Sequence, residues 1–282
     1  MGNINSDIFK TDSPGYIKSM ERTSWMQNLS SSGICKYSYD FEKYRFDKEF
    51  LSLLKDRNFI SKSINLDQIH KELLESDMEV DVNQINKIVQ TCYEPSEEIK
   101  RLYKDFMADC VQPIIDKPVY YQRTPTFRFS FPKSKGMTKR DYHNDIMLGH
   151  PPEEINVWVP FTNASESRSF IILDLEKSMQ ILKEFKYDMS AVHQAIWTDD
   201  SIKDYCDNYS KVVELDEGEF ILFDSRCIHA AILNDSDYTR VSMDVRVIQV
   251  EEYDTLPFRY LGTGRRQAKF TPEDFYSAVE LK

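Results

Sequence analysis

The segment Arg240–Val247 reads Arg-Val-Ser-Met-Asp-Val-Arg-Val, and its strict alternation decides how the fold of this chain is interpreted. Because successive side chains of a β-strand point to opposite faces, one face is wholly apolar and the other carries arginine, serine and aspartate. Thr126–Phe131 has the same form, with three phenylalanines opposite threonine, arginine and serine. A solvated outer face would explain either strand alone. Arginines and an acid without lysines on both strands also fit a small barrel that holds a polar ligand inside while helices cover its outside, and we favour this interpretation.

The chain changes character near residue 116. Before this point, Leu66–Ser76 and Glu97–Cys110 have apolar residues at three- and four-residue spacings, which is typical of amphipathic helices. Glu94-Pro95-Ser96 precedes the second segment and predicts its start. After residue 116, alternating segments predict further strands at Ile155–Phe161 and Glu219–Phe223. We therefore expect an α+β fold with a mainly β core.

These patterns divide the chain into three parts. We expect residues 1–115 to form a mainly helical elaboration packed on the core, residues 116–250 to form the β core, and residues 251–282 to form a C-terminal extension. Within the core, residues 176–209 make too long a connection for a hairpin turn and predict a lid or wall over the site. In the extension, Thr271-Pro272-Glu273-Asp274 combines a capping residue, a proline and acids, and predicts a short C-terminal helix.

Composition limits the classes of partner. The 282 residues include 47 acids and 36 Lys or Arg, and the net charge of -11 argues against nucleic-acid binding. One basic cluster (Lys133, Lys135, Lys139 and Arg140) is either a solvated hairpin or a local attraction for an anionic small molecule. A mean hydropathy of -0.54 and the lack of a long apolar run argue against a membrane span. The polar start of the chain lacks a secretory signal, and the five cysteines form no CxxC pair, so we expect a cytoplasmic protein with reduced thiols.

Three residues have the spacing of a metal site. His143 and Asp145 lie two positions apart, so an extended chain places both side chains on one side. The distant partner is His229, which follows a predicted turn and strand and lies just beyond the end of that strand. Arg240 comes eleven positions later, at the start of the alternating strand. The combination is far more specific than an isolated His-x-Asp.

This combination resembles the Fe(II)- and 2-oxoglutarate-dependent dioxygenases, and the resemblance covers about Val119–Ile248. Gly149-His150 and Glu154–Thr162 are similar to the phytanoyl-CoA-hydroxylase-like branch, in particular to oxygenases of the streptomycin-biosynthesis type in carbohydrate pathways. The resemblance implies a double-stranded β-helix, the jelly-roll or cupin-like barrel, packed by the N-terminal helices. It also implies Fe(II) as cofactor, with 2-oxoglutarate and O2 as cosubstrates.

The resemblance assigns roles to the site residues. His143, Asp145 and His229 would bind Fe(II) on one face and leave three positions for 2-oxoglutarate and O2. Asp145 argues against the related halogenases, in which a small residue replaces the carboxylate. Arg240 would bind the remote carboxylate of 2-oxoglutarate, with the Ser242 hydroxyl beside it. The alternative is that Arg240 is a structural ion-pair partner of an acid such as Asp244.

Other polar residues on the same strand faces have open roles. Arg246 could support Asp145 or the cosubstrate carboxylate, or pair with Asp244. Asn156 and Arg128 could each contact cosubstrate or substrate. His150 is expected to be a loop or pocket residue, and Cys227 a small buried one.

The sequence therefore predicts an oxygenase that hydroxylates or otherwise oxidises a polar small molecule, such as a sugar or nucleotide-linked sugar in a glycan or natural-product pathway. Two alternatives stay open at this point. One is a jelly-roll binding or sensor protein that holds a metal without turnover, and the other is a cupin-type sugar epimerase that uses a His and Tyr pair without iron. The residues do not indicate the oligomeric state, the oxidised carbon or the type of oxidation.

Overall fold

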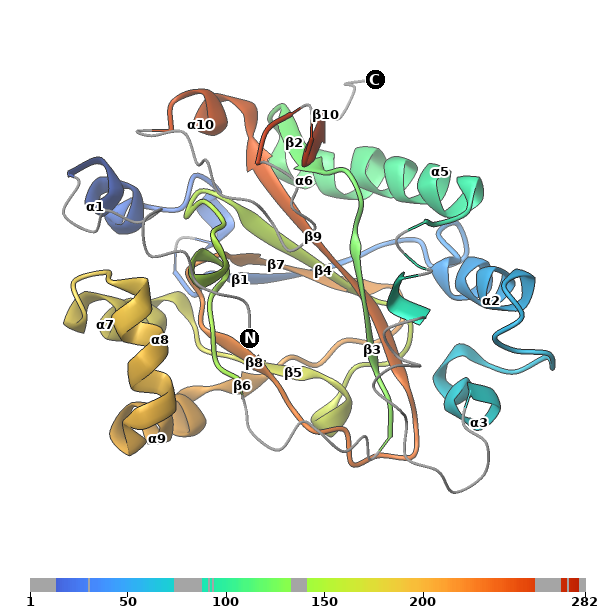
Figure 1. Cartoon of the computed structure of the whole chain (residues 1–282). Helices are drawn as coiled ribbons and strands as arrows, with labels where there is room; N and C mark the ends of the chain where they lie inside the picture. Colours follow the sequence, from blue (N-terminus) through green and yellow to red (C-terminus); the bar gives the residue numbers. More distant parts are fainter. Residues whose placement is uncertain are drawn as a thin grey trace.

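Two antiparallel sheets form the centre of the molecule, with helices on the outside (Figure 1). This computed structural model describes residues 14–29, 31–73, 88–90, 92, 94–132, 141–256, 270–272 and 274–278. The predicted basic cluster at 133–140 lies outside the described residues. No helix within these ranges combines the length and apolar character needed to cross a membrane.

The larger sheet is built around the strand that contains the alternating segment Arg240–Val247. Its spatial order is β1 (Ile34–Ser38), β7 (Glu219–Asp224), β4 (Ile155–Pro160), β9 (Arg240–Gln249), β2 (Val119–Gln122) and β10 (Tyr276–Ala278), and β3 (Thr126–Ser130) also pairs with β9. All of these pairings are antiparallel. The predicted strands at 126–131, 155–161, 219–223 and 240–247 are therefore confirmed.

The register of β9 places its polar residues beside those of its neighbours. Arg128 on β3 lies opposite Ser242, and Asn156 on β4 lies opposite Arg246. The alternate, apolar face packs under the helices: Phe127, for example, contacts Phe50 of α2, with ring centroids 4.6 Å apart. The helices thus cover the apolar face, and the polar side chains occupy the opposite face.

The smaller sheet packs against that opposite face. It consists of β6 (Lys211–Val212), β5 (Phe170–Ile172) and β8 (His229–Ala231), in this order. Trp158 of β4 and Phe170 of β5 meet edge to face with their ring centroids 4.8 Å apart, and both belong to an apolar cluster between the sheets. The space between the two sheets therefore contains apolar packing as well as the polar residues of β3, β4 and β9.

The described portion of the N-terminal part is mainly helical. Its helices are α1 (Pro14–Glu21), α2 (Phe46–Asp56), α3 (His70–Leu73), α5 (Glu97–Phe106) and α6 (Gln112–Ile115), with a π-helical turn at Met107–Val111 and 3₁₀ turns at Gln27–Leu29 and Leu66–Gln68. The Ser96 side chain caps α5 by accepting a hydrogen bond from the Ile99 N–H at 3.2 Å. The prediction missed β1, which adds an edge strand to β7. The boundary at residue 116 therefore does not separate helices from the sheet.

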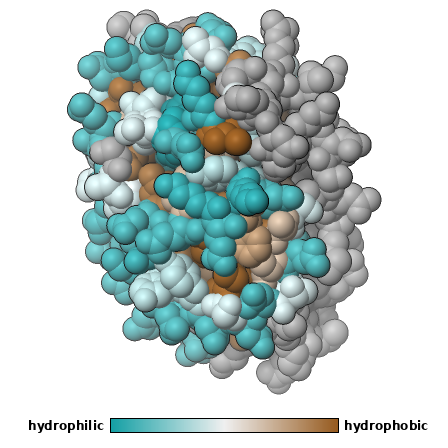
Figure 2. Space-filling view, turned by 90° about the vertical axis from the view of Figure 1, so that its left-hand side faces the viewer, coloured by the Kyte–Doolittle hydropathy of each residue, from teal (hydrophilic) through white to brown (hydrophobic). Residues whose placement is uncertain are grey.

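Three helices occupy the predicted insertion. They are α7 (Leu175–Glu184), α8 (Met189–Thr198) and α9 (Asp200–Tyr209), and an aspartate caps the N-terminus of each. Their buried residues share an apolar cluster with Tyr142 and Ile146, next to His143. Figure 2 shows the outer face on this side of the molecule as mostly hydrophilic, with separate apolar areas. The insertion is a packed wall beside the candidate metal ligands, and its movement as a lid stays a prediction.

The C-terminal helix predicted after Thr271 is wrong. The extension contains α10 (Val250–Asp254), but the backbone carbonyl of Thr271 accepts from the N–H groups of Asp274, Phe275 and Tyr276 in a single turn. The chain then enters β10, which pairs with β2. Tyr276 is fully buried in a cluster with Ile248 and Phe270, and burial of this aromatic residue overrides the local capping pattern.

Candidate metal centre

The backbone brings the two predicted histidine ligands together. His143 and His229 form an isolated antiparallel bridge, in which each N–H donates to the carbonyl oxygen of the other, at 3.0 and 2.8 Å. Their ring centroids are 4.5 Å apart. Asp145 starts a 3₁₀ turn (Asp145–Leu148) that is capped by the Asn144 side chain. One potential ligand atom each from His143, Asp145 and His229 lies within 4.8 Å of the others.

Each imidazole is held by a backbone carbonyl two residues before it. The Nδ1 of His143 lies 2.8 Å from the carbonyl oxygen of Asp141, and the Nδ1 of His229 lies 3.0 Å from that of Cys227. Because a carbonyl oxygen only accepts, Nδ1 must carry the proton in both rings. The Nε2 atom of each ring is then the unprotonated nitrogen that can bind a metal.

Asp145 supplies a carboxylate with one oxygen still unpartnered. Arg246 donates to Oδ2 from Nε at 3.0 Å, and its Nη2 lies 2.9 Å from the same oxygen in an ion pair. The other oxygen, Oδ1, has no hydrogen-bond partner among the described residues, although Asp145 is fully buried. Leaving a buried carboxylate oxygen unpartnered is costly, so this atom fits a metal ligand.

Electrostatics keep His143 and Asp145 in their metal-binding forms. Burial, with a smaller effect of the nearby His229, lowers the pKa of His143 to about 3, so this ring is neutral at neutral pH. Burial alone would raise the pKa of Asp145, but the charge of Arg246, helped by the surrounding histidines, holds it well below its usual range. Two imidazoles and one carboxylate that share one face are the donor set of non-haem Fe(II) sites with open positions.

Arg240 lies deep on the polar face, and no carboxylate of the described residues pairs with it. Its Nε donates to the Arg168 carbonyl oxygen at 3.0 Å, its Nη1 donates to the Ser242 hydroxyl at 2.7 Å, and its guanidinium lies 5.6 Å from the centre of the Trp158 ring. Within the described ranges no acid forms an ion pair with it, because Asp244 pairs with Arg128 instead. The alternative in which Arg240 pairs with Asp244 is therefore wrong. Burial lowers the pKa of Arg240 to about 10, which leaves it charged at neutral pH.

The remaining predicted residues also line the polar face. Arg246 pairs with Asp145, one of the three roles left open for it. Arg128 donates from Nε to Asp244 at 2.7 Å. Asn156 is 2% exposed, and its Nδ2 has no hydrogen-bond partner in the described part of the chain. It therefore offers a buried amide donor next to Arg246.

A buried polar network behind the metal ligands was not predicted. The Nδ1 of His150 lies 2.7 Å from Glu154 Oε2, and the Tyr276 hydroxyl donates to Glu154 Oε1. The His150 N–H also donates to the Asp145 carbonyl oxygen at 3.2 Å. The four-residue spacing of His150 and Glu154 could have indicated their contact. Nothing near Tyr276 in the sequence could have indicated that it lies beside them.

A second missed residue, Arg226, braces the segment that leads to His229. This fully buried side chain donates from Nε and Nη2 to the two carboxylate oxygens of Asp224, at 2.8 and 2.7 Å. Its Nη1 donates to the carbonyl oxygens of Met20 and Arg22 at the end of α1. The pair ties the N-terminal helix to the turn between β7 and β8.

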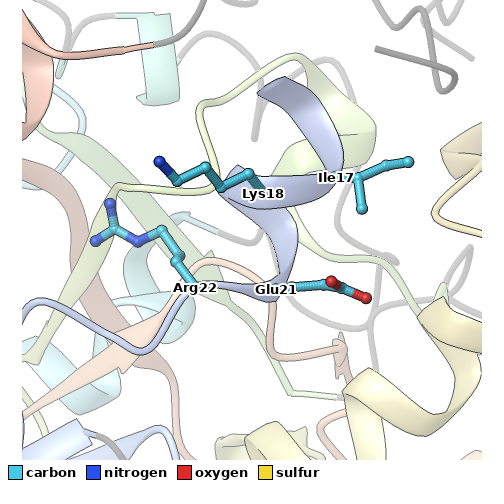
Figure 3. Close-up of a pocket in the computed structure, with 4 residues that line it drawn as sticks. All are labelled: Ile17, Lys18, Glu21 and Arg22. Atoms are coloured by element: carbon cyan, nitrogen blue, oxygen red, sulfur yellow. The ribbon is translucent and has the colours of Figure 1, made fainter. Parts of the chain in front are cut away.

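The other histidines and Cys227 are not members of the triad. His70 contacts the Thr239 hydroxyl, and His193 accepts a hydrogen bond from Trp197. Cys227 is fully buried, as expected. A surface hollow of about 510 Å³ is lined by residues of α1 and by Arg22, with Lys18 and Arg22 extending to one side (Figure 3). Arg22 already pairs with Glu252 at 2.5 Å, and none of the triad lines this hollow.

Comparison with known proteins places this geometry in a family context. Streptomycin biosynthesis protein StrG of Streptomyces griseus is 27% identical over 177 residues, which cover 59% of this chain and 69% of StrG. The apoform of EctD from S. alaskensis superposes with a TM-score of 0.58 at 14% identity, over 94% of this chain and 88% of EctD. The structure of EctD with 2-oxoglutarate and 5-hydroxyectoine gives a TM-score of 0.52 at 14% identity, over 88% of this chain and 85% of EctD.

The EctD structures support the fold, and the decisive match is to a family. The phytanoyl-CoA dioxygenase (PhyH) family matches residues 63–242, a span that contains the whole triad and Arg240. The predicted class of non-haem iron and 2-oxoglutarate-dependent dioxygenase is thus confirmed, as is the similarity to the streptomycin-biosynthesis type. This chain belongs to the phytanoyl-CoA dioxygenase (PhyH) family.

Proposed function

We propose that this protein uses Fe(II), 2-oxoglutarate and O2 to hydroxylate or otherwise oxidise a polar small molecule, such as a sugar or nucleotide-linked sugar in a glycan or natural-product pathway. The observation that carries the proposal is the unpartnered Oδ1 of buried Asp145 beside two imidazoles whose Nδ1 atoms are fixed by carbonyls. The two sheets that pack face to face would be the halves of a double-stranded β-helix. His143, Asp145 and His229 would bind the iron at one edge of the space between the sheets.

The protein's own contribution is to orient the reactants. The chemistry supplied by bound Fe(II) is the activation of O2, coupled to oxidation of 2-oxoglutarate to succinate and CO2. Asp141 and Cys227 hold the imidazoles through their carbonyl oxygens, and Arg246 fixes the carboxylate of Asp145. The site is thus arranged before any cosubstrate binds, which reduces reorganisation during the reaction.

Arg240 is the proposed anchor for the remote carboxylate of 2-oxoglutarate. Its guanidinium is buried, is held by Ser242 and the Arg168 carbonyl, and has no acid partner among the described residues. A buried cation of this kind requires an anion, and a guanidinium binds a carboxylate through two parallel hydrogen bonds. Ser242 would then orient the guanidinium and could contact the carboxylate itself.

The choice of a polar substrate is supported by the side chains between the sheets. Arg128 and Asn156 have donors without partners in the described structure, and such donors suit hydroxyl, phosphate or carboxylate groups better than a lipid chain. The name of StrG assigns that protein to streptomycin biosynthesis, which supports a natural-product pathway for its relative.

The test of the anchor uses anaerobic difference spectra of the Fe(II) protein titrated with 2-oxoglutarate. Arg240→Gln should weaken cosubstrate binding by at least about 2 kcal/mol while Fe(II) affinity is retained. Arg123→Gln is the matched control, because Arg123 is an exposed arginine that contacts the C-terminal segment. Unchanged 2-oxoglutarate affinity in Arg240→Gln would refute the anchor.

The test of the substrate is a panel of nucleotide sugars, amino sugars, free amino acids and acyl thioesters, incubated with Fe(II), 2-oxoglutarate and O2. We expect substrate-coupled succinate formation with a carbohydrate. Succinate formation coupled only to a non-carbohydrate would refute the sugar proposal and leave the iron chemistry intact. Metal binding without 2-oxoglutarate turnover would favour the sensor alternative, and product formation without O2 consumption would favour the epimerase.

A further inference from the structure

Arg128 differs from the other two arginines on the polar face in its exposure. Its side chain is 38% exposed, whereas the side chain of Arg246 is 8% exposed and Arg240 is buried. Its position on β3 lies opposite Ser242 of β9, whose hydroxyl accepts a hydrogen bond from Arg240. Arg128 therefore lies close to the cosubstrate anchor, at a more open place on the same face.

Among the described residues, a single nitrogen of Arg128 has a partner. Its Nε donates to Asp244 Oδ2 at 2.7 Å, and within the described ranges neither Nη atom has a hydrogen-bond or ion-pair partner. Asp244 fixes the plane of the guanidinium from one side. The edge that carries the two Nη groups is left for a ligand, and this edge matches the spacing of two oxygens of a phosphate or carboxylate.

The charges of the site favour an anion there. Asp145 balances Arg246, and Asp244 balances Arg128. With Fe(II) and 2-oxoglutarate bound, the two charges of the metal cancel those of the cosubstrate, and the charge of Arg240 is left over. Among these groups on the polar face one net positive charge is therefore left, whereas Glu154 lies behind the ligands and the chain as a whole carries -11.

We propose that Arg128 binds an oxyanion of the primary substrate, a phosphate or a carboxylate, and so selects an anionic small molecule. This inference rests on the proposed function, because it assumes that 2-oxoglutarate occupies the buried end at Arg240. Asp244 is a positioning residue that holds Arg128 through Nε. A neutral sugar would leave the Nη edge without a charged partner, whereas a sugar phosphate, nucleotide sugar or sugar acid would satisfy it.

The experiment uses the full chain loaded with Mn(II) and saturating 2-oxoglutarate, so that the metal and Arg240 are both occupied. Line broadening of inorganic phosphate in ³¹P spectra and of ¹³C-acetate, caused by the bound Mn(II), reports weak binding near the metal. The variant is Arg128→Gln combined with Asp244→Asn, which removes the ion pair without leaving a buried charge. Arg123→Gln again controls for the loss of one surface cation.

We expect at least one anion to bind the wild-type protein and to bind the double variant at least about tenfold more weakly, the scale of one charge-assisted contact. Arg128→Lys should bind the anion with intermediate affinity, because lysine keeps the positive charge but cannot donate two parallel hydrogen bonds as a guanidinium does. Preference for phosphate would identify a phosphorylated substrate, and preference for acetate a carboxylated one.

Several outcomes would overturn the assignment. If the wild type and the double variant bind the anions equally, or if neither binds them, Arg128 does not bind a substrate oxyanion. A tenfold loss of 2-oxoglutarate affinity in the double variant would assign Arg128 to the cosubstrate instead. If the wild-type Mn(II) protein failed to bind 2-oxoglutarate, the proposed function itself would fail, and this readout is separate from anion binding.

Discussion

Replacing Arg246 with methionine should destabilise the metal-free protein strongly. Arg246 donates from Nε to Asp145 Oδ2 at 3.0 Å and brings Nη2 to 2.9 Å from the same oxygen, and Asp145 is fully buried. The variant leaves a carboxylate whose two oxygens both lack a partner in the described structure. Removal of one partner of a buried ion pair costs about 3–5 kcal/mol, and for a domain of this size the midpoint of thermal unfolding should fall by about 6 °C or more.

The assay is urea unfolding of the metal-free protein, followed by circular dichroism and tryptophan fluorescence. The control is the double variant Arg246→Met with Asp145→Asn, which removes both charges and should recover most of the lost free energy of unfolding. Added Mn(II) should raise the stability of the single variant but not that of the double variant, because Asp145 is a ligand only when it is ionised. The proposed role of the Arg246–Asp145 ion pair would be refuted if the single variant lost less than about 1 kcal/mol of its free energy of unfolding. It would also be refuted if the single and double variants lost equal amounts.

Three further predictions concern the surroundings of the site. Below pH about 6.5 the free energy of unfolding of the metal-free protein should fall by up to about 1.4 kcal/mol per pH unit. The reason is that His143 takes up a proton in the unfolded chain, whereas the folded ring, with a pKa of about 3, does not. Urea unfolding at a series of pH values should show that His143→Gln lacks the one-proton contribution of His143 to this pH dependence. Tyr276→Phe should lower the free energy of unfolding by about 1–3 kcal/mol, because buried Glu154 loses the hydrogen bond from the tyrosine hydroxyl. The control is Tyr209→Phe, at a residue that is 48% exposed, which should leave the free energy of unfolding unchanged in the same assay. Amide hydrogen exchange in residues 176–209 should slow when substrate and cosubstrate are both bound, and equal rates in the free and bound states would count against a lid.

Features that depend on a single short segment could be predicted from the sequence. A strand with one apolar and one polar face must alternate apolar and polar residues, so both β9 and β3 could be predicted. The same alternation shows which face holds Arg128 and Arg246. His143 and Asp145 are neighbours on one extended segment, and His229 follows the end of a strand. These features need no knowledge of which strands pair, and the structure brings the three residues to one place.

Features that depend on distant pairing could not be predicted in this way. The strand β1 has only five residues, and its partner β7 lies far along the chain, so its own sequence gives a weak signal beside strong helical neighbours. The segment after Thr271 has good helix-start chemistry, yet burial of Tyr276 against Ile248 and its hydroxyl contact with Glu154 favour a strand. Asp244 could have paired with any of three arginines, and only the register of β3 and β9 shows that its partner is Arg128.

The backbone bridge between His143 and His229 also affects the order of events during synthesis of the chain. Until residue 229 has left the ribosome, a nascent chain offers only His143 and Asp145, which are too few donors to retain a divalent ion against its hydration shell. The second imidazole comes into place only when β8 docks beside the earlier segment and closes a long loop. Metal uptake should therefore mark the end of folding, and an unfinished chain, with its thiols still exposed, would be spared the oxidative damage that prematurely bound iron causes.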